Sequence, residues 1–335
     1  MMIKYAGFWL LFQLFSQGTS FAAPEMTHLA QAEMKWLQKA TIAAQKLSYS
    51  GTFVYRNGKQ SETSRIVHVA SNGNRREKLV VLDGSPREVI RNNDEVQCYL
   101  PELRQVIIEQ RSTRRAFPAL LPASLSSLGK HYVLRQVASA RVAGFDSRVL
   151  RLEPRDSLRY GHQYWIDADS GLLLKAEVFD ARGEILESLA FTELQLGEPH
   201  ADALKPSYAV ASPGKPGWEV RQARLSDLRE EVPWQFKADL PGFRREASLR
   251  RSITQEKGEA QEVLHWVFSD GLAALSVFIS PLPDNQGAGN TDELQTGGAF
   301  SVAKRVLDRH QIVVMGDVPP ETVKLFAAGI VVKSK

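Results

Sequence analysis

The feature that most constrains the fold of this chain is a long series of short segments in which apolar and polar residues alternate. The alternation starts near residue 50, where Phe53 and Tyr55 share one parity, and Asn57-Gly58 follows as a two-residue hairpin turn. Successive side chains of a strand point to opposite faces, so this period of two predicts strands with one buried face. The chain therefore builds sheets rather than helical bundles.

The same pattern predicts about eleven strands before residue 200, separated by turns rich in Asn, Asp and Gly. No segment has the pattern of a strand–helix–strand crossover, so we expect a mainly β, α+β chain whose first domain is an antiparallel meander curved into an unclosed barrel. Besides the strand that starts at residue 50, the predicted strands are residues 66–70, 78–82, 88–91, 95–100, 105–109, 132–136, 148–153, 160–167, 172–179 and 184–194.

A single amphipathic helix precedes the strands. Residues 28–47 place apolar side chains such as Trp36, Leu37 and Leu47 at the helical period. Thr27 is the expected N-cap, because its hydroxyl can accept a hydrogen bond from a backbone N–H of the first turn. We expect this helix to pack on the sheet.

Residues 1–22 have the features of a secretory signal peptide. Lys4 precedes a nearly apolar run at residues 6–15, and Ser20-Phe21-Ala22 supplies a small-x-small cleavage site before Ala23. An N-terminal membrane anchor is the alternative, but the apolar run is shorter than the roughly 20 residues that span a bilayer. We expect export with cleavage after residue 22.

Cysteine usage limits the compartment further. Cys98 is the only cysteine, so the chain has no intramolecular disulfide. An exported protein of this size without disulfides fits the bacterial envelope space, and we predict a periplasmic location. Cys98 alternates with Val96 and Leu100, which predicts that its side chain points into a core.

The chain divides into two predicted domains. Residues 201–217 are rich in Pro, Ala, Ser and Gly and are expected to link a domain at residues 23–200 to a smaller α+β domain at residues 218–335. The second domain is predicted to contain strands 243–252, 262–268, 272–279 and 312–315, a tight turn at Ser269-Asp270-Gly271, a mobile polar loop at 281–298 and a helix at 321–331 opened by Pro319-Pro320.

An apolar segment interrupts the strands of the first domain. Residues 116–128 contain two prolines and five large apolar residues, and form either a loop packed on the core or a lid over an apolar cavity. The candidate lid residues are Phe117, Leu120, Leu121, Leu125 and Leu128.

The sequence lacks the motifs of common catalytic and metal sites. Residues 167–171 (DADSG) resemble the start of a calcium loop, but Val178 stands where the closing glutamate is required, so a hairpin turn is expected there. The histidines are scattered, and neither a CxxC pair nor a nucleophile elbow nor a phosphate-binding glycine loop is present. We predict a non-catalytic protein without a metal or cofactor.

Local basic clusters offer candidate sites for an anionic partner, because the overall formal charge is only +4. Arg75, Arg76 and Lys78 precede one predicted strand, and Arg87 and Arg91 stand four apart on the next. Pairing of these strands would create a patch for an acidic protein segment or a phosphorylated glycolipid headgroup, and a solvated sheet face is the alternative. Nucleic acid is not an expected ligand of an exported protein. A second cluster, the candidate partner-binding residues, is Arg244, Arg245, Arg250 and Arg251.

Several longer strings resemble one known family. They are SGTFVY at 50–55, REKLVVL at 76–82, DGSPREVIR at 83–91, VQCYLP at 96–101, VFSDGLAALSVFI at 267–279 and VVMGDVPPETV at 313–323. In these stretches the chain resembles the MucB/RseB family, and the resemblance covers essentially the whole chain after residue 22.

This resemblance implies a function that composition and periodicity do not show. Family members are periplasmic negative regulators of sigma-E type (extracytoplasmic function) sigma factors. They bind the periplasmic part of a transmembrane anti-sigma factor, shield it from regulated proteolysis and self-associate. Their first domain is a lipoprotein-carrier-like unclosed barrel with an apolar cavity, and their second domain contributes much of the anti-sigma contact. Lipopolysaccharide-type lipids are expected to release the complex. A lipid or lipoprotein carrier is the alternative function, although a simple carrier does not need the second domain.

Overall fold

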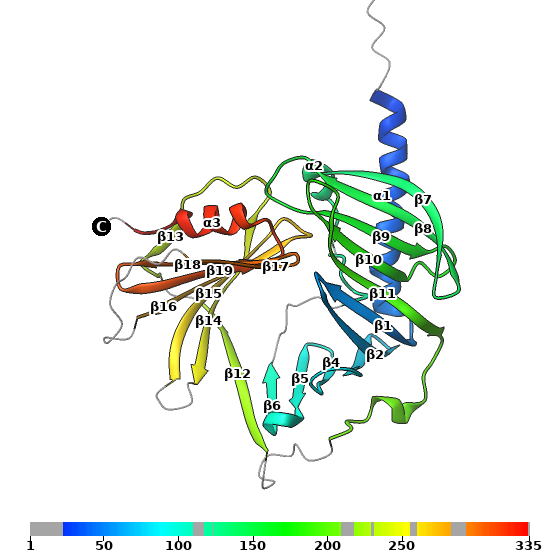
Figure 1. Ribbon diagram of the computed structural model, residues 1–335, viewed down its shortest axis with the longest axis horizontal. Helices are drawn as coiled ribbons and strands as arrows, with labels where there is room; N and C mark the ends of the chain where they lie inside the picture. Colours follow the sequence, from blue (N-terminus) through cyan, green and yellow to red (C-terminus); the bar gives the residue numbers. More distant parts are fainter. Residues whose placement is uncertain are drawn as a thin grey trace, which may run out of the picture.

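The computed structural model describes residues 23–109, 117–122, 124–208, 218–228, 231–254, 260–282 and 293–333. These residues form a mainly β protein with two domains side by side (Figure 1), as the alternating pattern predicts. The predicted signal peptide, residues 1–22, lies outside the described residues. No helix in the described part of the chain is long and apolar enough to cross a membrane.

The N-terminal helix α1 (Ala23–Lys46) starts earlier than predicted, so Thr27 lies inside the helix and is not its N-cap. Pro24 does not stop the helix, because a proline in the first turn has no intrahelical N–H bond to lose. The helix buries Leu37, Ala40 and Ala44 and packs on the sheet along β7 (Figure 1). The prediction of a helix against the sheet is confirmed.

The first domain contains the eleven predicted strands. Paired antiparallel neighbours run in the order β6-β5-β4-β3-β2-β1-β11-β10-β9-β8-β7, and no ladder among the described residues joins β6 to β7, so the barrel is unclosed as expected. The strands are β1 (Tyr49–Asn57), β2 (Gln60–Ser71), β3 (Asn74–Val81), β4 (Glu88–Asn92), β5 (Glu95–Leu100), β6 (Gln105–Glu109), β7 (Tyr132–Val142), β8 (Phe145–Pro154), β9 (Gly161–Asp167), β10 (Leu173–Phe179) and β11 (Ile185–Leu196).

The sheet continues from the first domain into the second. The first half of β12 (Glu219–Asp227) pairs in parallel with β6, and its second half pairs antiparallel with β14 (Arg244–Thr254). A backbone bond of 2.8 Å from the Glu219 N–H to the Arg104 carbonyl starts the parallel ladder. The sequence pattern does not predict β12, and its pairing on both sides makes the two domains one hydrogen-bonded structure.

The second domain is a sheet covered by one helix. Its order is β12-β14-β15-β16-β19-β18-β17, and α3 (Pro320–Gly329) lies across β18 and β19 (Figure 1). The helix starts at the predicted proline pair, with Pro319 as the N-cap. The remaining elements are β13 (Trp234–Phe236), β15 (Ala260–Ser269), β16 (Ala274–Pro281), β17 (Glu293–Gly297), β18 (Phe300–Leu307), β19 (His310–Gly316) and β20 (Ile330–Val332).

The prediction of a polar loop over residues 281–298 is wrong at its C-terminal end, where β17 pairs with β18. Residues 283–292 lie outside the described part of the chain. All five residues of β17 are exposed, so no buried face imposes an apolar alternation on its sequence.

The first half of the predicted linker is packed against the first domain. The Ser207 N–H donates to the Glu88 carboxylate at 2.9 Å, and the Tyr208 ring stacks on Tyr99 with centroids 6.4 Å apart. The η2 turn (Ala201–Leu204) lies beside β3. Residues 209–217 lie outside the described residues. The described part of the predicted linker is therefore held by specific contacts with the first domain.

Candidate functional site

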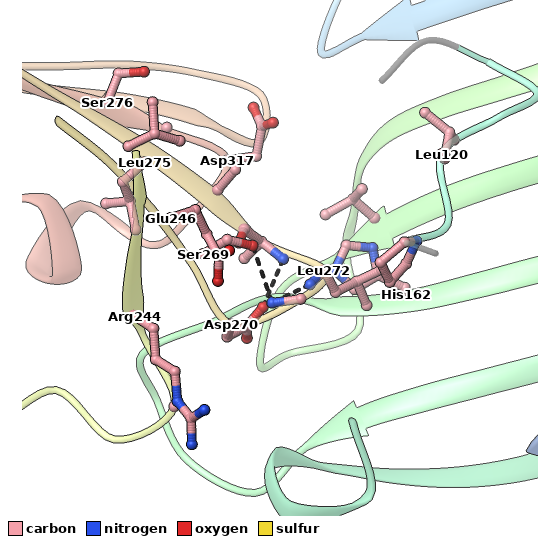
Figure 2. Close-up of a pocket in the computed structure, with 18 of the residues that line it drawn as sticks. Leu120, His162, Arg244, Glu246, Ser269, Asp270, Leu272, Leu275, Ser276 and Asp317 are labelled. Carbon is pink, nitrogen blue, oxygen red and sulfur yellow. Dashed lines mark hydrogen bonds between the residues drawn. The ribbon is translucent and has the colours of Figure 1, made fainter. Parts of the chain in front are cut away.

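A cleft with a volume of about 1060 Å³ lies between the two domains. One wall comes from β9, β10, β11 and residues 120–131 of the first domain, and the other comes from β14, β15 and β16 of the second. Figure 2 shows Leu120 and His162 on the first wall, with Arg244, Glu246 and Leu275 across from them. A cleft with apolar walls and a few convergent polar groups is the default candidate for a binding site.

The walls of the cleft combine apolar surface with separated charges. Leu189, Leu272 and Phe278 supply apolar surface, whereas Glu177 and Arg251 supply opposite charges. No group of three potential metal ligands occurs among the described residues. This lining suits a peptide with both apolar and charged side chains better than it suits a small reacting substrate.

A buried carboxylate, that of Asp270, is among the residues that line the cleft. Asp270 belongs to the predicted tight turn, and its Oδ1 accepts the N–H groups of Leu272 and Ala273 at 2.8 Å each. Its Oδ2 reaches into the first domain, where it accepts the Tyr132 hydroxyl at 2.9 Å and Arg159 Nη1 at 2.7 Å. The turn is confirmed, and its side chain also joins the two domains.

Arg159, like Asp270, makes several contacts that fix its side chain. Its Nε donates to Asp156 at 3.0 Å, its Nη2 donates to the Pro241 carbonyl at 2.6 Å, and its guanidinium lies 4.9 Å from the centre of the Phe243 ring. The side chains of Arg159 and Asp270 are both 0% exposed. Removing one partner of such a pair costs about 3–5 kcal/mol, because the other charge stays buried without compensation.

The lining of the cleft also contains two carboxylates that interact with each other. Glu187 of β11 and Asp317, which follows β19, both line the cavity. Burial, and then the charge of Asp317, raises the pKa of Glu187 to about 7, although a hydrogen bond from the Tyr55 hydroxyl lowers it. On the first-domain wall, burial lowers the pKa of His162 to about 4, so this imidazole is neutral near pH 7.

The predicted basic patch of the first domain is divided between two faces of the sheet. β3 and β4 do pair, and Arg91 stands directly opposite Glu77, whose carboxylate lies 3.9 Å from Arg91 Nε. Arg87 donates to Glu62 at 2.9 Å. Because alternate residues of a strand point to opposite faces, Arg76 and Lys78 face away from Arg91 and from Arg75. The five cations do not form one surface.

Lys78 has a structural partner on the outer face. Its Nζ lies 3.3 Å from the fully buried carboxylate of Glu88 and donates to the Lys205 carbonyl at 2.6 Å. This lysine therefore holds the linker against the sheet. Arg75 and Arg76 are exposed at the β2–β3 end of the sheet.

The second basic cluster is also divided. Arg244 and Arg251 line the cleft, and Arg251 donates to Glu109 of the first domain at 3.1 Å. Arg245 lies over the Trp266 ring at 5.0 Å, and Arg250 pairs with Glu262 at 2.5 Å. Neighbouring strand residues point to opposite faces, so only one arginine of each pair faces the cleft. A bulge after Arg245 shifts the alternation, so Arg244 and Arg251 share that face despite their odd spacing.

The candidate lid residues lie in the core of the first domain. Phe117, Leu121, Leu125 and Leu128 are buried, and Leu120 is half-buried and lines the cleft. The Phe117 ring lies 4.9 Å from Phe191 and 5.1 Å from Phe53. The segment is thus packed down in this structure, and its opening stays a prediction.

A half-exposed apolar row runs across the concave face of the unclosed barrel. Leu79, Val89, Cys98 and Ile107 are consecutive cross-strand partners on β3, β4, β5 and β6. Arg91 flanks this row on the same face, because it is two residues from Val89. Burial raises the pKa of the Cys98 thiol. Cys98 is half-buried rather than enclosed, and the alternation around it correctly predicted its face.

Sequence reasoning missed the residues that join the domains. Arg159 stands in a loop without periodicity, and its partner Asp270 is 111 residues away. Glu187 sits on a predicted strand like any other polar residue. A contact between distant charges leaves no local pattern, so the turn at Ser269-Asp270-Gly271 was the only available signal.

Two family models match the chain and together cover most of it. The MucB/RseB N-terminal domain matches residues 32–210, and the MucB/RseB C-terminal domain matches residues 229–331. The gap between the matches falls in the predicted linker and β12. The division into two domains seen in the structure agrees with these models.

Individual relatives match over nearly their full lengths. The "Sigma factor AlgU regulatory protein MucB" of Pseudomonas aeruginosa is 34% identical over 322 residues, which cover 93% of this chain and 94% of that protein. The "Sigma-E factor regulatory protein RseB" of Salmonella typhimurium is 27% identical, with 96% and 97% covered. The solved complex of Pseudomonas aeruginosa MucA/MucB matches with a TM-score of 0.70 and 29% identity, covering 91% of this chain and 100% of that one. The chain belongs to the MucB/RseB family.

Proposed function

We propose that this protein is a periplasmic regulator that binds the periplasmic segment of a transmembrane anti-sigma factor in the cleft between its domains. The observation that carries the proposal is a cleft of about 1060 Å³ with walls from both domains, in a chain whose relatives are named sigma factor regulators. The crystal structure of MucB with the periplasmic part of MucA, to which this chain is similar, supports a partner of this kind.

The cleft provides the interactions that an extended segment needs. Apolar side chains of the partner bury against Leu189 and Leu272, and its acidic side chains face Arg244. A bound segment loses the freedom to enter a protease active site, since proteolysis requires an accessible extended chain. Binding in the cleft would therefore protect the anti-sigma factor and keep the sigma factor inactive.

Two neighbouring arginines allow a matched test of the binding surface. Arg244→Glu changes a cleft residue, whereas Arg245→Glu changes an exposed residue over Trp266 outside the cleft. We expect Arg244→Glu to weaken binding of a fluorescent anti-sigma periplasmic peptide about tenfold, with Arg245→Glu within about twofold of wild type. Protection of the same peptide from protease should follow affinity. Equal loss in both variants, or in neither, contradicts docking in the cleft.

Release of the partner by an acylated ligand belongs to the same proposal. The half-exposed row Leu79–Val89–Cys98–Ile107 offers a surface for an acyl chain, and Arg87 and Arg91 flank it on the concave face. Both arginines have acidic partners, so an anionic headgroup such as that of lipopolysaccharide must replace Glu62 and Glu77. The ligand releases the partner only if it binds the free protein more tightly than the complex.

The headgroup site can be tested with a double variant. Arg87→Ala with Arg91→Ala should weaken release of the labelled peptide by lipopolysaccharide, because the phosphates lose their cations. Arg75→Ala with Arg76→Ala is the matched control, because both residues are exposed and stand on the neighbouring strand β3. Normal release from the first variant would show that Arg87 and Arg91 serve only their ion pairs.

A lipid or lipoprotein carrier is the second candidate, and the half-exposed concave row favours it. Transfer of a bound fluorescent lipid to acceptor vesicles, without any effect of the lipid on peptide affinity, would support the carrier. Self-association is a further part of our proposal, and light scattering over a range of protein concentrations tests it. A constant monomer mass would contradict it.

A further inference from the structure

The Asp270 turn of the second domain contacts the C-terminal end of the candidate lid segment and the start of β7. The Ser127 hydroxyl lies 3.4 Å from the Asp270 carbonyl, and the Tyr132 hydroxyl donates to its carboxylate at 2.9 Å. A Cβ atom added to Gly271 would lie 3.4 Å from Ser127 Oγ and 3.8 Å from Leu128 Cδ2. The turn is thus seated against both ends of the short helix α2 (Leu128–His131).

The same residues are part of the first domain's core. Leu125, Leu128 and Tyr132 are at most 8% exposed and belong to one apolar cluster with Phe117 and Leu121. The core segment and the turn therefore cannot be displaced separately. Moving Tyr132 removes a hydrogen bond from Asp270, and moving Asp270 leaves the buried guanidinium of Arg159 without its counter-charge.

We infer that the Asp270 turn couples the packing of residues 117–122 and 124–131 to the position of the second domain. In one state the segment is packed, the Asp270–Arg159–Tyr132 network is complete and the cleft has the width seen here. In the other state the segment loosens, the network breaks and the second domain moves. This inference rests on the proposed function for its biological use, because it would transmit a ligand in the barrel to a partner in the cleft.

Two features favour a coupled pair of states over a gradual response. The network is fully buried, so partial separation leaves charges without either protein or water partners. Its members also come from three separate parts of the chain, namely the α2 end, the β8–β9 loop and the β15–β16 turn. Coupling is reciprocal, so a partner that fixes the second domain must also slow loosening of the segment.

The inference can be tested in the free protein, without partner or lipid. Asp270→Asn keeps the Oδ1 acceptor of the turn but removes the charge that faces Arg159. We expect hydrogen exchange of residues 117–122 and 124–131, which belong to the other domain, to become about tenfold faster. Tyr132→Phe removes one hydroxyl from the same network and should accelerate exchange in the same residues by a smaller factor. This variant keeps the inference testable if Asp270→Asn is too unstable to study.

Thr322→Val is the matched control for Tyr132→Phe. The Thr322 hydroxyl is also buried and also crosses the domain interface, where it donates to the Leu158 carbonyl at 2.9 Å, but it does not contact the core segment. Exchange in the segment should stay unchanged in this variant. Unchanged exchange in Asp270→Asn and Tyr132→Phe, or equal acceleration in Thr322→Val, overturns the inference.

A second measurement separates this inference from the proposed function. With lipopolysaccharide as the probe, the fold-change in affinity for the labelled peptide should be at least about threefold smaller in Tyr132→Phe than in wild type or Thr322→Val. No lipid effect on wild type overturns the proposed release and leaves the exchange result to decide the coupling. A normal lipid effect in Tyr132→Phe overturns the coupling and leaves the release intact.

Discussion

The carboxylate of Glu187 in the first domain is repelled by the carboxylate of Asp317 in the second domain. Its strand neighbours in register are Asn57 and Val178, neither of which is charged, and the second domain presents Asp317. The Tyr55 hydroxyl donates to its carboxylate, and burial together with the Glu187 charge raises the pKa of Tyr55 to about 12. With its pKa raised to about 7, Glu187 changes charge near neutral pH.

Glu187→Gln should therefore change how stability depends on pH. Between pH 4.5 and pH 7 the folded protein holds a proton on Glu187 that the unfolded chain has lost, so wild-type stability falls as pH rises through this window. From pH 5 to pH 8 the unfolding free energy of wild type should fall by about 2 kcal/mol more than that of Glu187→Gln. Urea unfolding at both pH values measures the difference. Parallel curves for the two proteins would contradict the raised pKa.

His162 titrates with the opposite sign, so the comparison must be made between variants. Its folded-state pKa is lowered to about 4, and stability from this group is lost as pH falls from about 6.5 toward 4. Wild-type stability alone mixes the two effects. Subtracting the Glu187→Gln curve isolates the carboxylate.

At the scale of single residues, the sequence predicted which face of the sheet a side chain occupies, but it did not predict which residue that side chain pairs with. The alternation placed Cys98 and Arg91 on one face correctly. It could not reveal that Arg91 has Glu77 opposite it, because the register of β3 on β4 depends on the turn between them. Cations that share a sequence cluster were therefore found as separate ion pairs.

At the scale of elements, the packed half of the linker depends on one buried carboxylate. Glu88 is 0% exposed, accepts the Ser207 N–H and pairs with Lys78, so it holds the linker against β3. This contact keeps Ser207 and Tyr208 against the sheet, so the linker presents Tyr208 to a protease only when the contact breaks.

Glu88→Gln should expose this part of the linker to chymotrypsin. Loss of the charge leaves Lys78 without its counter-ion, and we expect destabilisation of about 1–3 kcal/mol and faster cleavage after Tyr208. Limited proteolysis followed by mass spectrometry identifies the site. Glu102→Gln is the control, because that residue is exposed on a short turn. Similar cleavage of the two variants would show that other contacts hold the linker.

The elements that were predicted and missed differ in burial. Strands β1 to β3 and β7 to β11 pack on the first core, and β4, β5 and β6 bury Glu88, Tyr99 and Val106. A buried face of this kind imposes the alternation that predicts these strands. β17 is exposed along its whole length, and β12 follows a segment rich in Pro and Gly. A strand that is stabilised mainly by backbone hydrogen bonds needs no alternation of apolar and polar side chains, so its sequence does not predict it.

At the scale of the whole molecule, the two domains are joined by ion pairs of very different burial. The Arg159–Asp270 pair is 0% exposed on both sides, whereas Arg251 and Glu109 are 23% and 26% exposed. Partly exposed pairs contribute only about 0–1 kcal/mol, because water and salt screen them. The buried pair should thus control whether the domains unfold together.

Arg159→Met should cost about 3–5 kcal/mol and separate the unfolding of the two domains, since Asp270 is left buried and unpaired. Arg251→Met is the matched control, because it deletes the other interdomain arginine and should cost less than about 1 kcal/mol. Scanning calorimetry should show one transition for wild type and the control, and two for Arg159→Met. A single transition at an unchanged temperature would mean that the buried pair does not link the domains.

The parallel ladder between β6 and β12 also has a consequence for biogenesis. Gln105 and Glu219, which bond to each other through their side chains, are 114 residues apart, so at roughly 5–20 residues per second β6 is synthesised several seconds before its outer neighbour exists. During that interval the backbone of residues 105–109 is an open template for any extended chain nearby. The first domain is therefore prone to aggregation until the second domain has been synthesised. A variant truncated in the linker should aggregate through β6.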